Sequence, residues 1–242
     1  MTRGEAGVLA CCGAAVGAVV AGWWLLAGLS GLAALGVGAL ASARPGLGLF
    51  GPVILNVPAG IALTIDDGPD PESTPRLLAI LDAAGAHATF FFLADRVIRY
   101  PELVTAVIAG GHEVGLHGLT HSARLTWVAP SRGEAWLREG VRVLQAAGAP
   151  EVRSFRPPFG VVSPRLFASA RAAGLAVVWV SVRTGDGVDI SGERLRKRLA
   201  SAVSGDIVLI HEGNGTTLAE LPAALAGWTA KTRVGSLAEL LP

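Results

Sequence analysis

Acidic, histidine and arginine side chains occur in this sequence at spacings that suit hydrolytic chemistry. Asp66 and Asp67 are adjacent after an apolar run, so their carboxylates point in different directions where a strand ends. His117 and His121 are four residues apart, so both imidazoles would share one face of a helical turn and bind one ion. One aspartate can then join the metal while the other stays free. Taken alone, each pair also fits a simpler role, as turn-capping aspartates or as surface and core histidines.

An arginine and a third histidine occur at two further positions of the same kind. Arg156 begins an Arg-Pro-Pro-Phe-Gly turn, and the prolines make that turn rigid. His211 ends a short apolar run that includes Leu209. These side chains can act together only if the strands before them end at the same edge of a sheet.

The elements that would position these residues follow from an alternating pattern in 61–242. Short runs rich in Val, Ile, Leu, Phe or Trp are typical of buried parallel strands, and the amphipathic stretches between them predict helices. Ser163 before Pro164, and Ser131 with Glu134 three residues on, predict two helix starts. The alternation predicts an α/β fold with a parallel sheet or barrel and an active site at the carboxyl ends of its strands. The predicted strands are 61–65, 88–93, 113–116, 176–182 and 207–210, and the predicted helices are 75–84, 101–109, 132–147, 164–173 and 192–202, with stops at Gly85, Gly110 and Gly174.

Composition excludes several classes of protein. The 242 residues are 51% hydrophobic and 16% charged, which excludes a disordered chain. The 20 Lys and Arg against 19 Asp and Glu leave a net charge of +1, so the sequence has no basic excess for nucleic acid. Cys11 and Cys12 are adjacent, which excludes a disulfide framework and a four-cysteine zinc site. We expect both to be small buried hydrophobes.

The apolar excess is concentrated in 6–43, which contains no Asp, Glu, Lys or Arg. Residues 1–44 are therefore predicted as a membrane segment. One straight helix of this length would reach about 57 Å, against about 30 Å of hydrocarbon, so either two short spans turning near 28–31 or one tilted span fits. A signal peptide has an apolar region of only about 7 to 15 residues, which disfavours cleavage. Arg3 and Arg44 flank the segment symmetrically, which leaves its orientation open.

The rest of the chain divides into a linker and a domain. The Pro- and Gly-rich stretch 45–60 is predicted as a juxtamembrane linker. Residues 61–242 have the length of one domain, by the usual range of about 100 to 200 residues, and are predicted as the catalytic domain. The protein is thus expected to be membrane-anchored, with the side of the catalytic domain left open.

Taken together, these stretches resemble the motifs of the polysaccharide deacetylases, carbohydrate esterase family four with its NodB-homology domain. TIDDGPD at 64–70 resembles the first motif, HGLTH at 117–121 the second, RPPFG at 156–160 the third and LIHEG at 209–213 the fifth. The resemblance extends over 61–242. It implies the family's α/β fold, a distorted barrel of alternating strands and helices, preceded here by a transmembrane helix or a short helical hairpin.

The resemblance also implies a metal-dependent mechanism. Asp67, His117 and His121 would bind a divalent metal, with zinc expected from two imidazoles and one carboxylate. Asp66 would act as the general base toward the water that attacks an acetamide or ester carbonyl, which the metal would polarise. His211 would act as the general acid and protonate the leaving amine.

Three more residues take supporting roles by the same resemblance. Arg156 would orient Asp66 and keep it ionised through a charge-assisted hydrogen bond. The backbone N–H of Phe159 would help to hold the developing oxyanion, and Leu209 would contact the substrate.

The fourth motif departs from the family pattern. The family usually has aspartate, two further residues, aspartate and tryptophan, whereas this chain has Arg-Thr-Gly-Asp-Gly at 183–187. Asp186 keeps the carboxylate that is expected to tune His211. Arg183 replaces the first aspartate and Gly187 replaces the tryptophan. Loss of the aromatic is expected to remove an apolar wall of the sugar pocket and to change how the substrate is held.

The prediction is a metal-dependent hydrolase that removes N-acetyl or O-acetyl groups from an envelope polysaccharide or a lipid-linked sugar. Its expected partners are this acetylated glycan and the membrane. Trp127 and Trp136 are expected either to line a glycan groove or to pack between helices. Two alternatives stay open: a hydrolase of other linear amides, and a catalytically quiet metal-binding scaffold at the membrane, which the changes in the fourth motif would favour if they abolish turnover.

Overall fold

The computed structural model describes residues 23, 30, 32, 35–40, 42 and 44–242. The chain divides into two compact units, Met1–Arg44 and Pro45–Pro242. The predicted membrane segment at 1–44 lies largely outside the described residues and stays a prediction. None of the helices in the part of the chain that the structure describes is long and apolar enough to cross a membrane.

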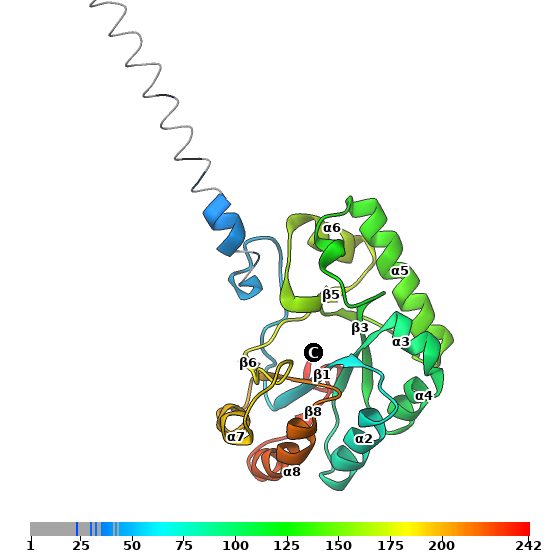
Figure 1. Ribbon diagram of the computed structural model, residues 1–242, viewed down its shortest axis with the longest axis vertical. Helices are drawn as coiled ribbons and strands as arrows, with labels where there is room; N and C mark the ends of the chain where they lie inside the picture. The colour runs from blue at the N-terminus through cyan, green and yellow to red at the C-terminus, as the bar shows by residue number, and fades with distance from the viewer. Residues whose placement is uncertain (1–22, 24–29, 31, 33–34, 41, 43) are drawn as a thin grey trace, which may run out of the picture. The chain divides into compact units, whose positions relative to one another are not determined.

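The second unit is built on one parallel sheet that curls into a half-barrel (Figure 1). The strand order is β5-β4-β3-β2-β1-β7-β6, and β8 pairs with the start of β1. Each of these pairs is parallel, which confirms the predicted α/β class. The strands are β1 (Ile61–Gly68), β2 (Thr89–Leu93), β3 (Glu113–Gly118), β4 (Ser154–Phe155), β5 (Ala176–Val177), β6 (Val182–Arg183), β7 (Ile207–His211) and β8 (Val234–Gly235).

Helices surround the outside of this sheet, as Figure 1 shows for α2 to α8. Each crossover between parallel neighbours needs a connection of this kind, and the helices bury the outer face of the strands. The helices are α2 (Ser73–Ala83), α3 (Ala94–Arg99), α4 (Pro101–Ala109), α5 (Pro130–Ala146), α6 (Pro164–Ala172), α7 (Gly192–Ala200), α8 (Gly215–Thr229) and α9 (Leu237–Leu240).

The predicted helix starts were right in one case and wrong in the other. Ser163 caps α6, since its side chain accepts a hydrogen bond from the Leu166 N–H. Ser131 lies inside α5, which begins one residue earlier at Pro130. Proline suits the first helical position because its missing N–H would have no intrahelical partner there, so it sets the start instead of the serine.

The predicted helix stops also need one adjustment. Gly85 and Gly174 both adopt the left-handed backbone conformation just beyond a helix end. After α4, Gly110 is the C-cap with φ −77°, and the left-handed residue is Gly111.

Two hydrophobic layers cover the two faces of the sheet. In β2, Phe90 and Phe92 belong to the larger cluster, which also contains helix residues such as Leu77. Phe91, between them in sequence, belongs to a smaller cluster with Val178 on the inside of the curl. This alternation follows from the two-residue repeat of a strand. The inside of the curl is therefore a second core, and it leads to the carboxyl ends of the strands.

The segment expected as a linker packs into the same compact unit as the sheet. Ile54 forms a parallel bridge with Val178, and Asn56 forms an antiparallel bridge with Asp206. Val57 is buried in the inner cluster. Residues 54–57 thus pair with chain segments next to β5 and next to β7, and the compact unit begins at Pro45.

The predicted strand 176–182 is divided into β5 and β6. Between them the chain leaves one part of the sheet and reaches another: Trp179 N–H donates to Ile54 O at 2.8 Å, and Ser181 N–H donates to Ile207 O at 3.1 Å. An apolar run cannot reveal such a change of pairing partner, because residues 177–180 stay buried while the chain passes from one part of the sheet to the other.

Candidate metal centre and active site

The end of β1 turns two adjacent carboxylates in different directions. Ala62 packs in the inner cluster, so Thr64 and Asp66 face the same interior by strand alternation. Asp67 has φ 73°, a conformation uncommon outside glycine, and the register with β2 shifts between Asp66 and Gly68. This irregularity turns the Asp67 side chain toward the rim, where β3 ends.

Asp67 meets both predicted histidines of the second motif. Its Oδ1 lies 3.3 Å from Nε2 of His117 and 3.4 Å from Nε2 of His121. One atom of each side chain lies within 4.8 Å of the others, so the three can hold one ion. The expected helical turn between the histidines is wrong: His117 lies in β3, and Gly118 with φ 116° lets the chain turn so that His121 returns to the rim.

Two buried polar atoms of this group have no hydrogen-bond partner among the described residues. Asp67 Oδ1 and His117 Nδ1 are buried, and neither makes a hydrogen bond with the described residues. A buried carboxylate oxygen without a donor costs free energy, and a bound cation would remove that cost. Two imidazoles and one carboxylate are a common zinc ligand set that leaves a coordination position open. The residues present therefore fit a divalent metal.

The charge states of the group also suit a metal. Burial alone would raise the pKa of Asp67, but the imidazoles of His117, His121 and His211 lower it to about 2. Burial lowers the pKa of His121 below its ordinary value despite the nearby Asp67 carboxylate. Asp67 is therefore ionised, and His121 favours the neutral form that binds metals.

Asp66 is held on the interior side by an arginine. Arg156 Nη1 donates to Asp66 Oδ1 at 2.8 Å and to Thr64 Oγ1 at 2.8 Å. Both Asp66 and Arg156 are buried, and the guanidinium lies 4.3 Å from the centroid of the Phe91 ring. The other carboxylate oxygen of Asp66, Oδ2, lies 3.9 Å from His117 Nδ1. Asp66 is thus fixed beside the metal group without being one of its three members.

His211 is held by Asp186 in the same manner. Asp186 Oδ1 lies 2.8 Å from His211 Nδ1, and its Oδ2 accepts from the His211 N–H at 3.0 Å. The hydroxyls of Thr184 and Thr217 donate to the same carboxylate, each at 2.6 Å. Since Nδ1 faces Asp186, Nε2 is the ring nitrogen that remains for proton transfer.

This pairing sets the charge of both groups. Burial alone would lower the pKa of His211, but Asp186 raises it above its ordinary value. Burial alone would raise the pKa of Asp186, but His211 and the two threonine hydroxyls lower it. His211 therefore keeps a proton to higher pH than a free histidine, as a general acid requires.

A cavity of about 160 Å³ joins the predicted base, acid and substrate residues. Leu209 lines it, as does Phe159, whose backbone has φ 58° and whose ring lies 4.1 Å from the His121 ring. Other lining residues include Asp66, Arg156 and His211. The three predicted metal residues and Asp186 do not line this cavity, although they contact its lining residues.

The sequence predicts the loss of an aromatic wall at Gly187, but a tryptophan from another segment lines the cavity. Trp179, from the segment between β5 and β6, lines the cavity. The Arg183 guanidinium lies 4.7 Å from the centroid of its indole ring. A Cβ at Gly187 would lie 3.1 Å from Cε1 of His211, so a larger residue there would press on the imidazole.

Sequence reasoning missed several residues that hold the site together. Thr184 and Thr217 saturate Asp186, and Trp179 O accepts from Arg156 Nη2 at 3.3 Å. Thr184 lies inside the fourth motif, so its role could have been predicted from the sequence. Thr217 and Trp179 come from segments with no motif, so only the fold brings them to the site.

These features define a class of protein: an α/β domain with an Asp-His-His group and a buried Asp-Arg pair at the carboxyl rim of a curled parallel sheet. A family model for polysaccharide deacetylases matches residues 57–178. A peptidoglycan-N-acetylglucosamine deacetylase of Bacillus cereus is 36% identical over 172 residues, which cover 69% of this chain and 78% of the relative. A chitooligosaccharide deacetylase of Bradyrhizobium is 34% identical over 156 residues, covering 63% of this chain and 70% of the relative.

Solved structures agree with these relatives. The peptidoglycan deacetylase PdaC from Bacillus subtilis superposes with a TM-score of 0.69 at 27% identity, covering 75% of this chain and 89% of that chain. A protein described as a family pseudoenzyme from Bacillus anthracis superposes with a TM-score of 0.70 at 26% identity, covering 76% and 65%. The chain belongs to the polysaccharide deacetylase family, as its motifs indicate. It is a hydrolase of the deacetylase type, which acts on carbon–nitrogen bonds other than peptide bonds.

Proposed function

We propose that this protein is a zinc-dependent deacetylase that removes N-acetyl groups from an envelope polysaccharide. One observation carries the proposal: three side chains that can hold one metal ion lie beside the fixed carboxylate of Asp66, and Asp66 pairs in register with the fixed imidazole of His211 on the neighbouring strand. Asp67, His117 and His121 would hold the ion. When bound, the ion would polarise the acetyl carbonyl and lower the pKa of a water molecule.

The protein's own residues then divide the proton transfers. Asp66 takes a proton from the attacking water, because its carboxylate is held next to the metal group by Arg156. His211 gives a proton to the leaving amine, because Asp186 keeps the imidazole protonated and oriented. The Phe159 N–H donates to the oxygen on which negative charge develops. The products are acetate and a free amino sugar.

The nature of the substrate follows from the relatives and the cavity. The relatives are named for N-acetylglucosamine in peptidoglycan and for chitooligosaccharides, both chains of N-acetylated sugars. The cavity beside the proposed base and acid is large enough for an acetyl group and is lined by Leu209 and Trp179. An O-acetylated glycan and a lipid-linked sugar share the same acetyl chemistry and belong to the same proposal.

Acetate release tests this function. The full 242-residue chain is incubated with chitotetraose and, separately, with an O-acetylated oligosaccharide, with added zinc or with a chelator. We expect acetate from the N-acetylated glycan with zinc and none after chelation. Zinc binding without acetate release from any acetylated glycan would overturn the deacetylase and favour the metal-binding scaffold.

We also propose that residues 6–43 anchor the protein in a membrane. The support is the length of this segment without a charged residue. Reporter domains fused to both ends, combined with membrane fractionation, test the anchor. Reporters on the same side support a hairpin, and reporters on opposite sides support one span. Recovery of both reporters in the fraction without membranes would overturn the anchor.

A further inference from the structure

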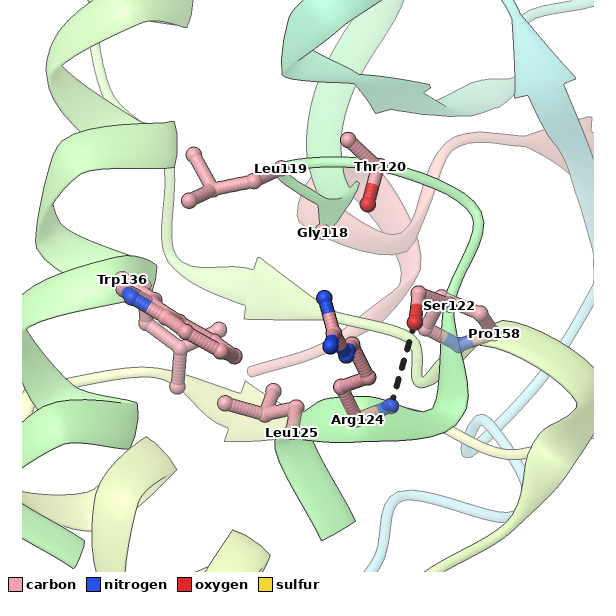
Figure 2. A pocket seen from close by; sticks show the side chains of 9 residues that line it. Gly118, Leu119, Thr120, Ser122, Arg124, Leu125, Trp136 and Pro158 are labelled. Carbon is pink, nitrogen blue, oxygen red and sulfur yellow. Dashed lines mark hydrogen bonds between the residues drawn. The ribbon is translucent and has the colours of Figure 1, made fainter. Parts of the chain in front are cut away.

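A second cavity lies at the same rim, beside the loop that carries the metal-binding histidines. Gly118 and Thr120, which lie between His117 and His121 in sequence, line it. Pro158, the neighbour of Phe159, lines it from the third motif. Its other walls come from the 3₁₀ helix Ala123–Thr126 and from α5 (Figure 2). Among the described residues, none lines both this cavity and the one that contains Asp66 and His211.

The only charged side chain among the residues that line this cavity is a cation. Figure 2 shows the Arg124 guanidinium at the centre of the lining residues, between Trp136 and Ser122. Within the described part of the chain, Arg124 has no carboxylate within ion-pairing distance, whereas Arg138 and Arg142 on α5 each pair with a glutamate. The cavity thus offers a positive charge without a counter-charge from the protein.

The neutral lining residues suit a sugar ring. Trp136 is half-buried, and an indole packs well on the C–H groups of a pyranose. Thr120 supplies a hydroxyl, and so does Ser122, whose Oγ accepts from the Arg124 N–H at 3.2 Å and keeps its own proton for donation. The volume of about 190 Å³ is below the range of drug-sized sites, about 300 Å³ and above, and fits one ring.

We propose that this cavity, here called the Arg124 pocket, binds a sugar ring that carries a carboxylate and belongs to the same glycan chain as the acetylated sugar. A single guanidinium matches the charge and the planar fork of one carboxylate. The ring belongs to the same chain because the pocket shares the His117–His121 loop and the Pro158–Phe159 turn with the active site. This inference rests on the proposed deacetylase function and adds to it a preference for acidic glycans.

A matched pair of substrates tests the inference. The first is a tetrasaccharide of alternating N-acetylglucosamine and N-acetylmuramic acid with free lactyl carboxylates, and the second is its methyl ester, which has the same rings without the charge. The full chain with zinc is assayed for acetate release on both. We expect kcat/KM for the acid to exceed that for the ester by about tenfold, a typical value for a hydrogen bond to a charged group.

Variants assign this preference to the pocket. Arg124→Ala is expected to bring the ratio of acid to ester close to one, and Arg124→Lys to restore it in part. Trp136→Ala is expected to raise KM for both substrates several-fold. The control is Arg76→Ala on α2, an exposed arginine outside the pocket, which should keep the wild-type ratio.

Binding without turnover separates this inference from the proposed function. Calorimetric titration of the Asp66→Asn chain with the acid and with the ester measures affinity while the substrates stay intact. Weaker binding of the acid by Asp66→Asn/Arg124→Ala supports the pocket, even if no variant releases acetate and the deacetylase is thereby rejected. The pocket would be overturned if Arg124→Ala kept the wild-type ratio of kcat/KM between acid and ester, and if Asp66→Asn and Asp66→Asn/Arg124→Ala bound the acid equally well. That result would not affect the proposed deacetylase function.

Discussion

The two halves of the proposed active site differ in how complete they are without a ligand. On one side is the acid–base half, in which Asp186 accepts hydrogen bonds from two threonines and from His211. In the same half, Arg156 donates hydrogen bonds to both Asp66 and Thr64. On the other side, in the group of Asp67, His117 and His121 (the metal group), Asp67 Oδ1 and His117 Nδ1 are buried without a hydrogen-bond partner among the described residues. The carboxylates of the acid–base half are paired by the protein, although Arg156 Nε is buried without a partner among the described residues, whereas Asp67 Oδ1 in the metal group would be paired by an ion.

This difference follows from where the residues stand in the fold. Asp66, Arg156 and Asp186 are buried, so their hydrogen bonds must be made internally. Asp67 and His121 stand at the rim with side chains 27% and 37% exposed, where an ion and water can enter. The proposed proton-transfer groups are thus held in fixed positions beside a metal group that an ion and water can reach.

The largest effect is expected from His117→Ala, which removes the buried member of the metal group. We expect loss of zinc binding and of acetate release, by at least about a thousandfold in kcat/KM, because the ion supplies several kcal/mol of transition-state stabilisation. Calorimetric zinc titration and the acetate assay measure both. His87→Ala, at a half-exposed histidine far from the rim, is the matched control and should keep both properties. Retained zinc binding in His117→Ala would contradict the ligand assignment.

Asp66→Asn separates the two halves. The amide keeps the shape of the side chain but cannot accept the proton, so we expect activity to fall by about a hundredfold to ten-thousandfold while zinc affinity changes little. The same two assays measure this split. Zinc binding lost together with activity would mean that Asp66 belongs to the metal half.

Asp186→Asn tests the acid half through pH. Asp186 raises the pKa of His211, so the wild type keeps the acid form above the ordinary histidine value of 6.5, and removal of the carboxylate lowers that pKa. The alkaline limb of kcat/KM should therefore move to lower pH, with a loss of about tenfold to a hundredfold above neutrality. The pH profile and an NMR titration of His211 measure it. Asp189→Asn, exposed and nearby, is the control; an alkaline limb that does not move in Asp186→Asn would reject the pairing.

The smallest effect on activity is expected at Glu212, the buried carboxyl next to His211. Its Oε2 accepts from Ser73 and Thr74, its Oε1 has no partner among the described residues, and burial raises its pKa to about 7. Its folded pKa lies above the ordinary value of 4.5, so its contribution to stability is present below 4.5 and is lost as pH rises through 7. Glutamine stays uncharged, so the Glu212→Gln protein should not lose stability in this way. At pH 8 its free energy of unfolding should exceed that of the wild type by about 2 to 3 kcal/mol.

Urea unfolding of wild type and Glu212→Gln at pH 4.5 and pH 8 measures the difference. Because Gln keeps the shape and can still accept from the two hydroxyls, activity should change by less than about tenfold. A constant stability difference between the two proteins across this pH range would contradict the raised pKa.

Much of the site was predictable from the sequence because its motifs follow strands that end at one rim. Asp66, His117 and His211 stand at the ends of β1, β3 and β7, and α4 keeps its predicted bounds. A strand of five residues or more shows its apolar run directly, and the parallel arrangement then brings the following residues together.

The remainder depends on contacts between distant segments. β4, β6 and β8 have two residues each, too few for any periodicity to show. The return of His121 depends on the backbone of Gly118, and the aromatic wall depends on the crossing that carries Trp179 from one part of the sheet to another. The Arg124 pocket joins a 3₁₀ helix, a long helix and a loop, which no single motif contains.

Activity as a function of zinc bound per chain tests the central claim most directly. Zinc is removed from the full chain and returned in steps, with bound zinc and the rate of acetate release from chitotetraose measured on the same samples. We predict that the rate rises in proportion to bound zinc and reaches its maximum at one ion per chain. Acetate release from the zinc-free chain would contradict the proposed metal-dependent mechanism, and so would a chain that binds one zinc ion and releases no acetate.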